Sequence, residues 1–150
     1  MTEPRLVAYL DAAEPLTLAD ARLQCRLDAE GSPPSHPDDD LLTAFVAVAR
    51  EQVERFTGRA LRWQRLRLAL DDFDDVIALP FSPVVEVESV SYVDASGSTV
   101  LMDAADYRLD TRTVPARLAP AIGTTWPDVA DTPGAVEIVY TAGHPTGVSP

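Results

Sequence analysis

A few side chains in this 150-residue sequence combine a reactive type with a position that could support chemistry. His36 and His144 lie in loops far apart in the sequence, and neither has a second histidine one helical turn away, the spacing of many zinc-binding helices. Cys25 is the single cysteine, so no second thiol completes a zinc set and no internal disulfide can form. The sequence predicts surface histidines, a buried Cys25, and no metal, cofactor or catalytic site.

The acidic run Asp71, Asp72, Asp74 and Asp75 is the remaining candidate for cation binding. It lacks the glycine and the distal glutamate of a calcium loop, so a solvated turn between strands is the favoured interpretation. No serine lies in the glycine-flanked elbow typical of hydrolases. We therefore expect a protein that is not an enzyme, with a hydrolase built on the acidic cluster as a remote alternative.

Charge and hydropathy exclude further classes of function. The net charge is −12 and all 12 basic residues are arginines, which argues against binding a phosphate backbone, because that binding needs many cationic side chains. No apolar run approaches the roughly 20 residues that span a bilayer, and no charged-then-apolar leader opens the sequence. A cytoplasmic origin with no membrane partner is expected.

A long amphipathic helix is the clearest element. Between Asp38 and Thr57, apolar residues recur at steps of three and four, and Gly58 is placed to end the helix in the left-handed conformation. Asp38 to Asp40 suit the N-cap and the first turn. The apolar stripe has to be covered, and it consists of Leu42, Phe45, Val46, Ala49, Val53 and Phe56. The opposite face carries Arg50–Glu54 and Glu51–Arg55, pairs expected to add a few tenths of a kcal/mol each.

Before this helix, Met1–Glu14 is either a flexible arm or an early strand. A short helix is expected after Thr17, which with Asp20 resembles a capping box. After the long helix, a strand with alternating Leu66, Leu68 and Leu70 follows.

Later strands are expected at Val85 to Val93, with a bulge near Ser89, and at Ala135 to Thr141. The stretch Val76–Leu79 cannot be a central strand because prolines follow it. Val114 to Asp131, rich in proline and glycine, is expected to be a long ordered loop.

The order of these elements predicts an α+β fold, with N-terminal helices packed on a small, mainly antiparallel β-sheet and long ordered loops. Residues 1–150 suit a single domain, with 1–15 as an arm and 144–150 as an extended tail. The predicted core is Leu42, Val46, Val53, Phe56, Leu66 and Leu68.

Several short sequence segments, and the order in which they occur, resemble those of the head-to-tail connector family of long-tailed phages and phage-derived gene transfer agents. The members of this family are also called head-completion adaptors. The first segment is the helix end Val53-Glu54-Arg55-Phe56-Thr57-Gly58-Arg59-Ala60-Leu61. Leu79-Pro80 and Pro83-Val84-Val85-Glu86-Val87-Glu88-Ser89-Val90-Ser91-Tyr92-Val93-Asp94 follow. The last are Ala105-Asp106-Tyr107, Pro115-Ala116-Arg117-Leu118, Trp126-Pro127 and Tyr140-Thr141-Ala142-Gly143.

This resemblance implies a structural virion protein of the phage neck, a homo-oligomeric ring, usually a dodecamer, that joins the portal protein to the tail or its stopper protein while DNA passes through the lumen. Such a particle neck would be assembled in the bacterial cytoplasm. Family members commonly continue into C-terminal helices that grip the portal, and this sequence does not. The candidates for the portal contact are therefore the N-terminal arm and the tail His144 to Pro150, with His144, Pro145 and Val148. For the contact with a neighbouring copy, the candidate is the stretch Val114 to Asp131 with Trp126, which could equally lie in its own core. The alternative function is a small acidic β-rich partner- or ligand-binding module.

Overall fold

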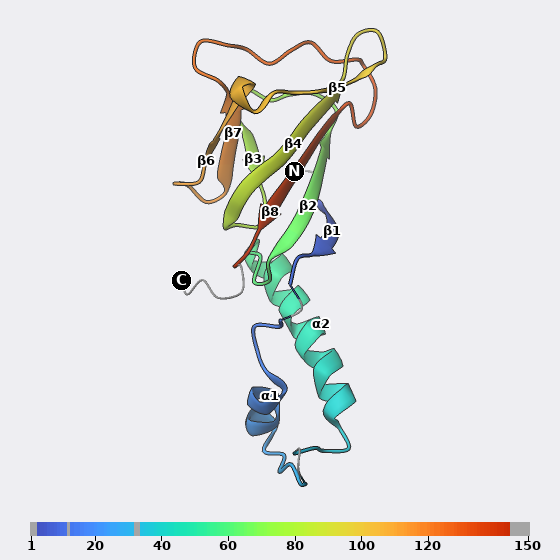
Figure 1. Cartoon of the computed structure of the whole chain (residues 1–150), viewed down its shortest axis with the longest axis vertical. Helices are drawn as coiled ribbons and strands as arrows, with labels where there is room; N and C mark the ends of the chain where they lie inside the picture. Colours follow the sequence, from blue (N-terminus) through green and yellow to red (C-terminus); the bar gives the residue numbers. More distant parts are fainter. Residues whose placement is uncertain (1–2, 12, 32–33, 145–150) are drawn as a thin grey trace.

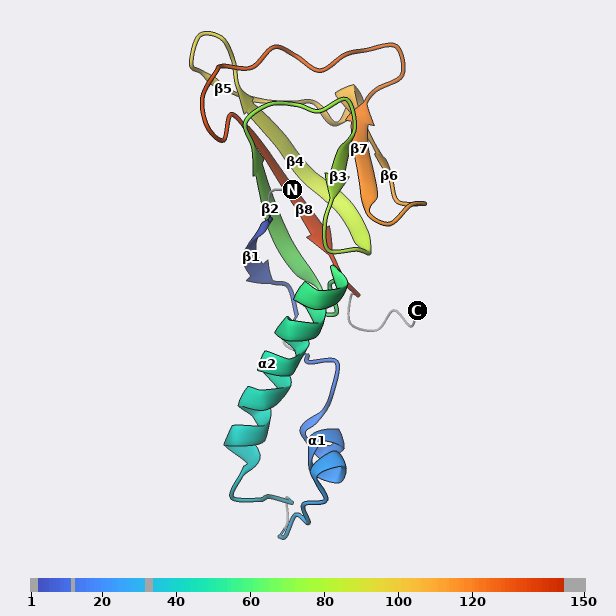
Figure 2. The same cartoon turned by 180° about the vertical axis from the view of Figure 1, so that it is seen from behind.

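The computed structural model describes residues 3–11, 13–31 and 34–144, and it divides into a body of two β-sheets and a helical stalk that projects from one end of this body (Figures 1 and 2). The stalk consists of α1 (Leu18–Cys25) and α2 (Asp39–Thr57). The α+β class predicted from the sequence is confirmed. The helices lie beside the sheets, at one end of the body, and α2 extends away from them.

The larger sheet has five antiparallel strands in the order β1-β2-β8-β4-β5. Their bounds are β1 Arg5–Tyr9, β2 Gln64–Leu70, β4 Val84–Val93, β5 Thr99–Leu101 and β8 Val136–Ala142. For the start of the chain, the early strand is thus the correct alternative. The predicted bulge is confirmed, since the β4–β8 register shifts between Val87 and Ser89.

The smaller sheet has the order β3-β7-β6, with β3 Ile77–Leu79, β6 Tyr107–Asp110, preceded by the 3₁₀ turn η1 Ala104–Asp106, and β7 Ala116–Pro120. β3 lies at an edge, as the nearby prolines require. The central strand β7 falls inside Val114–Asp131, so the expectation of an uninterrupted loop there is wrong. The strand has only five residues and ends on Pro120, and so it shows little alternation in the sequence.

One hydrophobic core joins the two sheets. Leu68, Val90 and Ile138 of the larger sheet, and Leu118 of the smaller one, are almost completely buried. Tyr140 is also buried, and its hydroxyl donates to the carbonyl of Pro80 at 2.9 Å. Burial raises the pKa of the Tyr140 phenol. The body therefore has a hydrophobic core that its own two sheets cover.

The ends of the helices follow local capping rules. The Thr17 hydroxyl accepts the amide of Asp20 at 3.1 Å, and the Thr17 amide donates back to the Asp20 carboxylate at 3.0 Å, which is the predicted capping box. Gly58 ends α2 with φ of 64°. Asp38 does not cap α2 through its side chain.

Instead, the Asp39 carboxylate joins the two helices. It accepts hydrogen bonds from the guanidinium of Arg22 at 2.7 and 2.5 Å and from the amide of His36 at 2.8 Å. This bidentate pair holds α1 against the first turn of α2.

Candidate functional site

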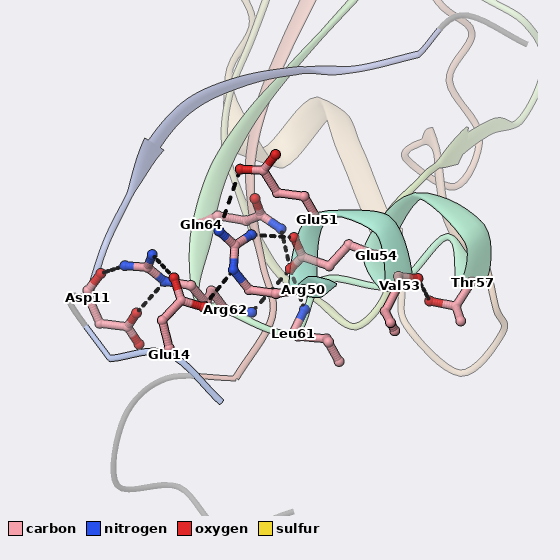
Figure 3. A network of polar contacts seen from close by, with 10 residues as sticks. All are labelled: Asp11, Glu14, Arg50, Glu51, Val53, Glu54, Thr57, Leu61, Arg62 and Gln64. Carbon is pink, nitrogen blue, oxygen red and sulfur yellow. Dashed lines mark hydrogen bonds and ion pairs between the residues drawn. The ribbon is translucent and has the colours of Figure 1, made fainter. Parts of the chain in front are cut away.

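A buried ion network lies where the stalk meets the body (Figure 3). At its centre are Arg50 and Glu54 of α2, each only 4% exposed. The Arg50 Nε donates to Glu14 Oε2 at 2.7 Å, and Arg50 Nη1 donates to Glu54 Oε2 at 2.8 Å. The sequence suggested an exposed helix pair of small effect, which is wrong, because the chain before α1 and the start of β2 cover this face of the helix.

The second oxygen of Glu54 reaches the chain that leads into β2. It accepts the backbone amide of Leu61 at 2.7 Å and the side-chain amide of Gln64 at 3.3 Å. One carboxylate thus binds its own helix, the turn after it and the first residue of β2. Such a set of contacts fixes the angle at which the stalk leaves the body.

Arg62 extends the network toward the N-terminal segment. Its Nη1 donates to Glu14 Oε1 at 3.0 Å, and its Nη2 donates to the backbone carbonyl of Asp11. The guanidinium carbons of Arg62 and Arg50 lie 4.0 and 4.8 Å from the ring centroid of Tyr9, within the range of cation–π attraction.

The electrostatics of Arg50 indicate a structural joint. Burial is the largest influence and lowers its pKa, but contacts with Glu14, Tyr9 and Glu54 together outweigh it and raise the pKa above its usual range. An arginine held permanently charged between two carboxylates neither donates nor accepts a proton during a reaction. The network therefore positions the stalk.

The apolar side of α2 is the second notable feature. Leu42 is buried, but Phe56 is 92% exposed and Val53 47% exposed. The prediction that Val53 and Phe56 belong to the core is wrong, because the sheets lie beyond the end of the helix and α1 covers only its first half. We call the exposed residues Leu41, Phe45, Val48, Ala49, Val53 and Phe56 the apolar strip.

The strip adjoins a groove between α1 and α2. This groove has a volume of about 590 Å³, and its lining includes Leu16, Leu23, Cys25, Leu42, Phe45 and Val46. Cys25 is exposed, so the expectation that it is buried is wrong. The short helix α1 fully buries none of its eight residues.

The contact candidates named from the sequence lie at separate places. Trp126 is half-buried, stacks on Phe73 with centroids 4.5 Å apart, and donates from Nε1 to the carbonyl of Asp74 at 2.8 Å. His144 is exposed and lines a surface hollow of about 350 Å³ together with Arg59 and Val114. Pro145 and Val148 lie outside the described residues.

Two carboxylates of the acidic run accept backbone amides, one from a distant segment and one from the next residue. The Asp71 carboxylate accepts the amide of Gly134 at 2.7 Å, and that of Asp72 accepts the amide of Phe73 at 2.7 Å. Among residues 3–11, 13–31 and 34–144, no three His, Cys, Asp or Glu side chains gather as ligands for a metal ion. Within the same part of the chain, neither helix is long and apolar enough to cross a membrane.

Comparison with solved structures gives consistent neighbours. A chain from the neck of an empty gene transfer agent particle, computed with C6 symmetry, is 31% identical with a TM-score of 0.74; the match covers 94% of this chain and 71% of that one. A chain from the virion of a native particle is 31% identical with a TM-score of 0.68, covering 93% and 71%. A chain from the native neck computed with C12 symmetry is 29% identical with a TM-score of 0.66, covering 94% and 69%.

No protein-family model matches the sequence, and no curated protein matches it. The structural matches nevertheless extend over nearly the whole chain. The structural similarity and the sequence identity both support the family that the sequence resembles. The chain therefore belongs to the head-to-tail connector family of phages and gene transfer agents.

Proposed function

We propose that this chain is a structural ring protein of a particle neck, an adaptor that joins the portal of the capsid to the tail and lets DNA pass. The observation that supports this most is the match to gene transfer agent neck chains over 94% of the sequence. The role requires no reaction. It requires surfaces that bind copies of the chain and neighbouring proteins in a fixed geometry.

The number of copies we propose is twelve. The similar neck chains come from reconstructions with C6 and C12 symmetry, and a ring with such symmetry uses heterologous contacts, in which each copy offers one surface to the copy before it and another to the copy after it. A rigid stalk at a defined angle to the body suits such repeated contacts.

The charge suits a DNA conduit. A subunit with a net charge of −12 repels phosphates, so DNA can move past a ring of such subunits without being held. Twelve acidic copies also repel one another, and apolar contacts have to offset this repulsion.

The proposed partners are the portal protein on one side and the tail or its stopper protein on the other, with assembly in the bacterial cytoplasm. His144, at the end of β8, and the following Pro145 and Val148 are our candidates for the portal contact. Trp126 is a weaker candidate, for contact with a neighbouring copy, because its ring stacks on Phe73 of its own chain.

Electron microscopy of the neck of purified particles tests the proposal. We expect twelvefold density between portal and tail into which both the body and the stalk fit. Particles from a strain that lacks the gene serve as the control and should lack this density and the tail. If the chain is absent from purified wild-type particles, the proposal is wrong.

A further inference from the structure

We propose that the apolar strip of α2, together with the groove between α1 and α2, is the surface on which a neighbouring copy of this chain docks. This inference rests on the proposed ring and adds the residues that form it. The neighbour contributes a different part of its surface, as a heterologous ring requires.

Exposure is the first argument. Fourteen large apolar side chains of the described residues are exposed, and half of them lie in one stretch, from Leu16 to Phe56. Scattered exposed apolar residues need no explanation, but a contiguous patch of this kind marks an interaction site. Burying Phe56 alone would remove most of an aromatic surface of about 150 to 250 Å² from water.

Charge identifies the occupant. From Leu41 to Ala49, nine consecutive residues carry no charge, although the whole chain has a net charge of −12. A second acidic copy meets no carboxylate along this stretch, although the lining of the groove includes Asp20. Near the end of the strip stands the exposed Arg55, a cation that suits the acidic surface of a neighbour.

The support of the strip is the third argument. Arg50 and Glu54 fix the root of α2 on the body, and the pair of Arg22 and Asp39 fixes α1 at the other end of the helix. A surface held in this way loses little conformational freedom when it binds, which favours association.

The shape of the molecule completes the argument. The 19 residues of α2 span about 28 Å, given a rise of 1.5 Å per residue. The helix projects from the body, so neither sheet of the same chain covers its strip (Figures 1 and 2). In a closed ring, the adjacent copy can therefore reach this surface.

Site-specific photocrosslinking identifies the occupant directly. With Phe56→p-benzoylphenylalanine in particles, we expect a product of two copies of the 16.2 kDa chain. The same replacement at Ile122, which is 88% exposed on the body, is the matched control and should give little of this product. A product with another protein, or no product, at position 56 would overturn the inference.

The natural Cys25 offers a test without mutation. It is exposed and lines the groove, so a thiol reagent should modify it rapidly in the free chain. In particles we expect its modification to slow about tenfold or more, the change that corresponds to roughly 1.4 kcal/mol of protection. Equal rates in the two samples would contradict docking at the groove.

A paired substitution separates this inference from the proposed function. We expect Phe45→Ser with Phe56→Ser to leave the melting temperature of the isolated chain nearly unchanged but to lower its incorporation into particles at least tenfold. Leu101→Ser with Ile122→Ser, also exposed, should leave incorporation unchanged. If the wild-type chain is in the neck and the stalk variant enters equally well, this inference fails alone; if the wild-type chain is not in the neck, the proposed function fails.

Discussion

The sheet body and the helical stalk differ in how far they bury their apolar residues within this chain. In the body, the apolar residues of two sheets cover one another, and side chains such as Leu118 and Ile138 reach zero exposure. In the stalk, α2 presents an equally regular apolar stripe, but Phe45 and Phe56 remain exposed. Hydrophobic periodicity therefore predicts that one face of a helix is buried. It does not predict whether the residues that bury this face come from the same chain or from another one.

The two regions also differ in what holds them. The body is stabilised by apolar burial, whereas the stalk is attached through buried charges, Arg50 and Glu54 above all. A buried ion pair adds little net stability over an apolar pair, but it specifies geometry through directed hydrogen bonds, and leaving one member unpaired is costly. This division suits a subunit whose stalk has to point in one direction.

The largest expected effect is at the root of the stalk. Glu54→Ala removes the buried partner of Arg50, leaving it the partly exposed Glu14 and the exposed Glu51, and it removes the acceptor for the amide of Leu61. The free energy of unfolding should therefore fall by about 3 to 5 kcal/mol. Gln52→Ala, at an exposed residue of the same helix, is the control and should change stability by less than about 0.5 kcal/mol. Equal effects in urea unfolding would show that the network does not hold the stalk.

In the core of the body, Leu118→Ala should cost about 2 to 5 kcal/mol, because it opens a cavity between the two sheets. Leu101→Ala, at a side chain that is 70% exposed, is the matched control. Thermal unfolding of both variants measures the difference. A loss below 1 kcal/mol for Leu118→Ala would contradict a shared core.

Some features of the body and of the stalk could be predicted from the sequence, and others could not. Leu66 and Leu68 were predicted to be buried from strict alternation, and the capping box and Gly58 from local chemistry, because each depends on neighbours in sequence. The sequence predicts Arg50–Glu54 as an exposed helix pair, which is wrong, because Glu14, which pairs with Arg50, and the amide of Leu61, which donates to Glu54, come from outside the helix. β7 was missed because five residues ending in proline carry too little pattern.

The error at Phe56 has a different cause. Its spacing is that of a core residue, and nothing local distinguishes a stripe covered by the same chain from one covered by another copy. The sequence does indicate that the apolar face of the long helix has to be buried. The family resemblance, which implies a ring, makes a neighbouring copy the cover that we propose.

A smaller effect is expected at Trp126. Trp126→Phe retains an aromatic ring against Phe73 but loses the hydrogen bond to the carbonyl of Asp74, so stability should fall by about 1 kcal/mol. Chemical denaturation followed by circular dichroism measures this loss. If the substitution leaves stability unchanged but lowers incorporation into particles, Trp126 contributes to an interface rather than to its own fold.

Acid should loosen the stalk before the body. The hydrogen bonds from Arg22, and then the amide of His36, lower the pKa of Asp39 below its ordinary 3.8. A carboxyl group whose pKa is depressed by folding contributes stability above its unfolded pKa, near pH 4, and this contribution is lost as the pH falls through the folded pKa. NMR shifts of α1 amides between pH 5 and 2 should report the release of Arg22. Asp39→Asn should remove this transition, and an unchanged transition in that variant would assign it to another group.

The smallest effect on folding is expected for Phe56→Ala, which also tests most directly whether the stalk differs from the body. If Phe56 belonged to a core, Phe56→Ala would cost about 3 to 5 kcal/mol, as aromatic truncations in cores do. At 92% exposure the side chain has almost no contacts to lose, so the isolated chain should change by less than about 0.5 kcal/mol. Urea unfolding of the free chain decides between the two values. A loss above 2 kcal/mol would mean that α2 folds back on its own body and that the stripe is covered from within; a negligible loss leaves the neighbouring copy as its cover.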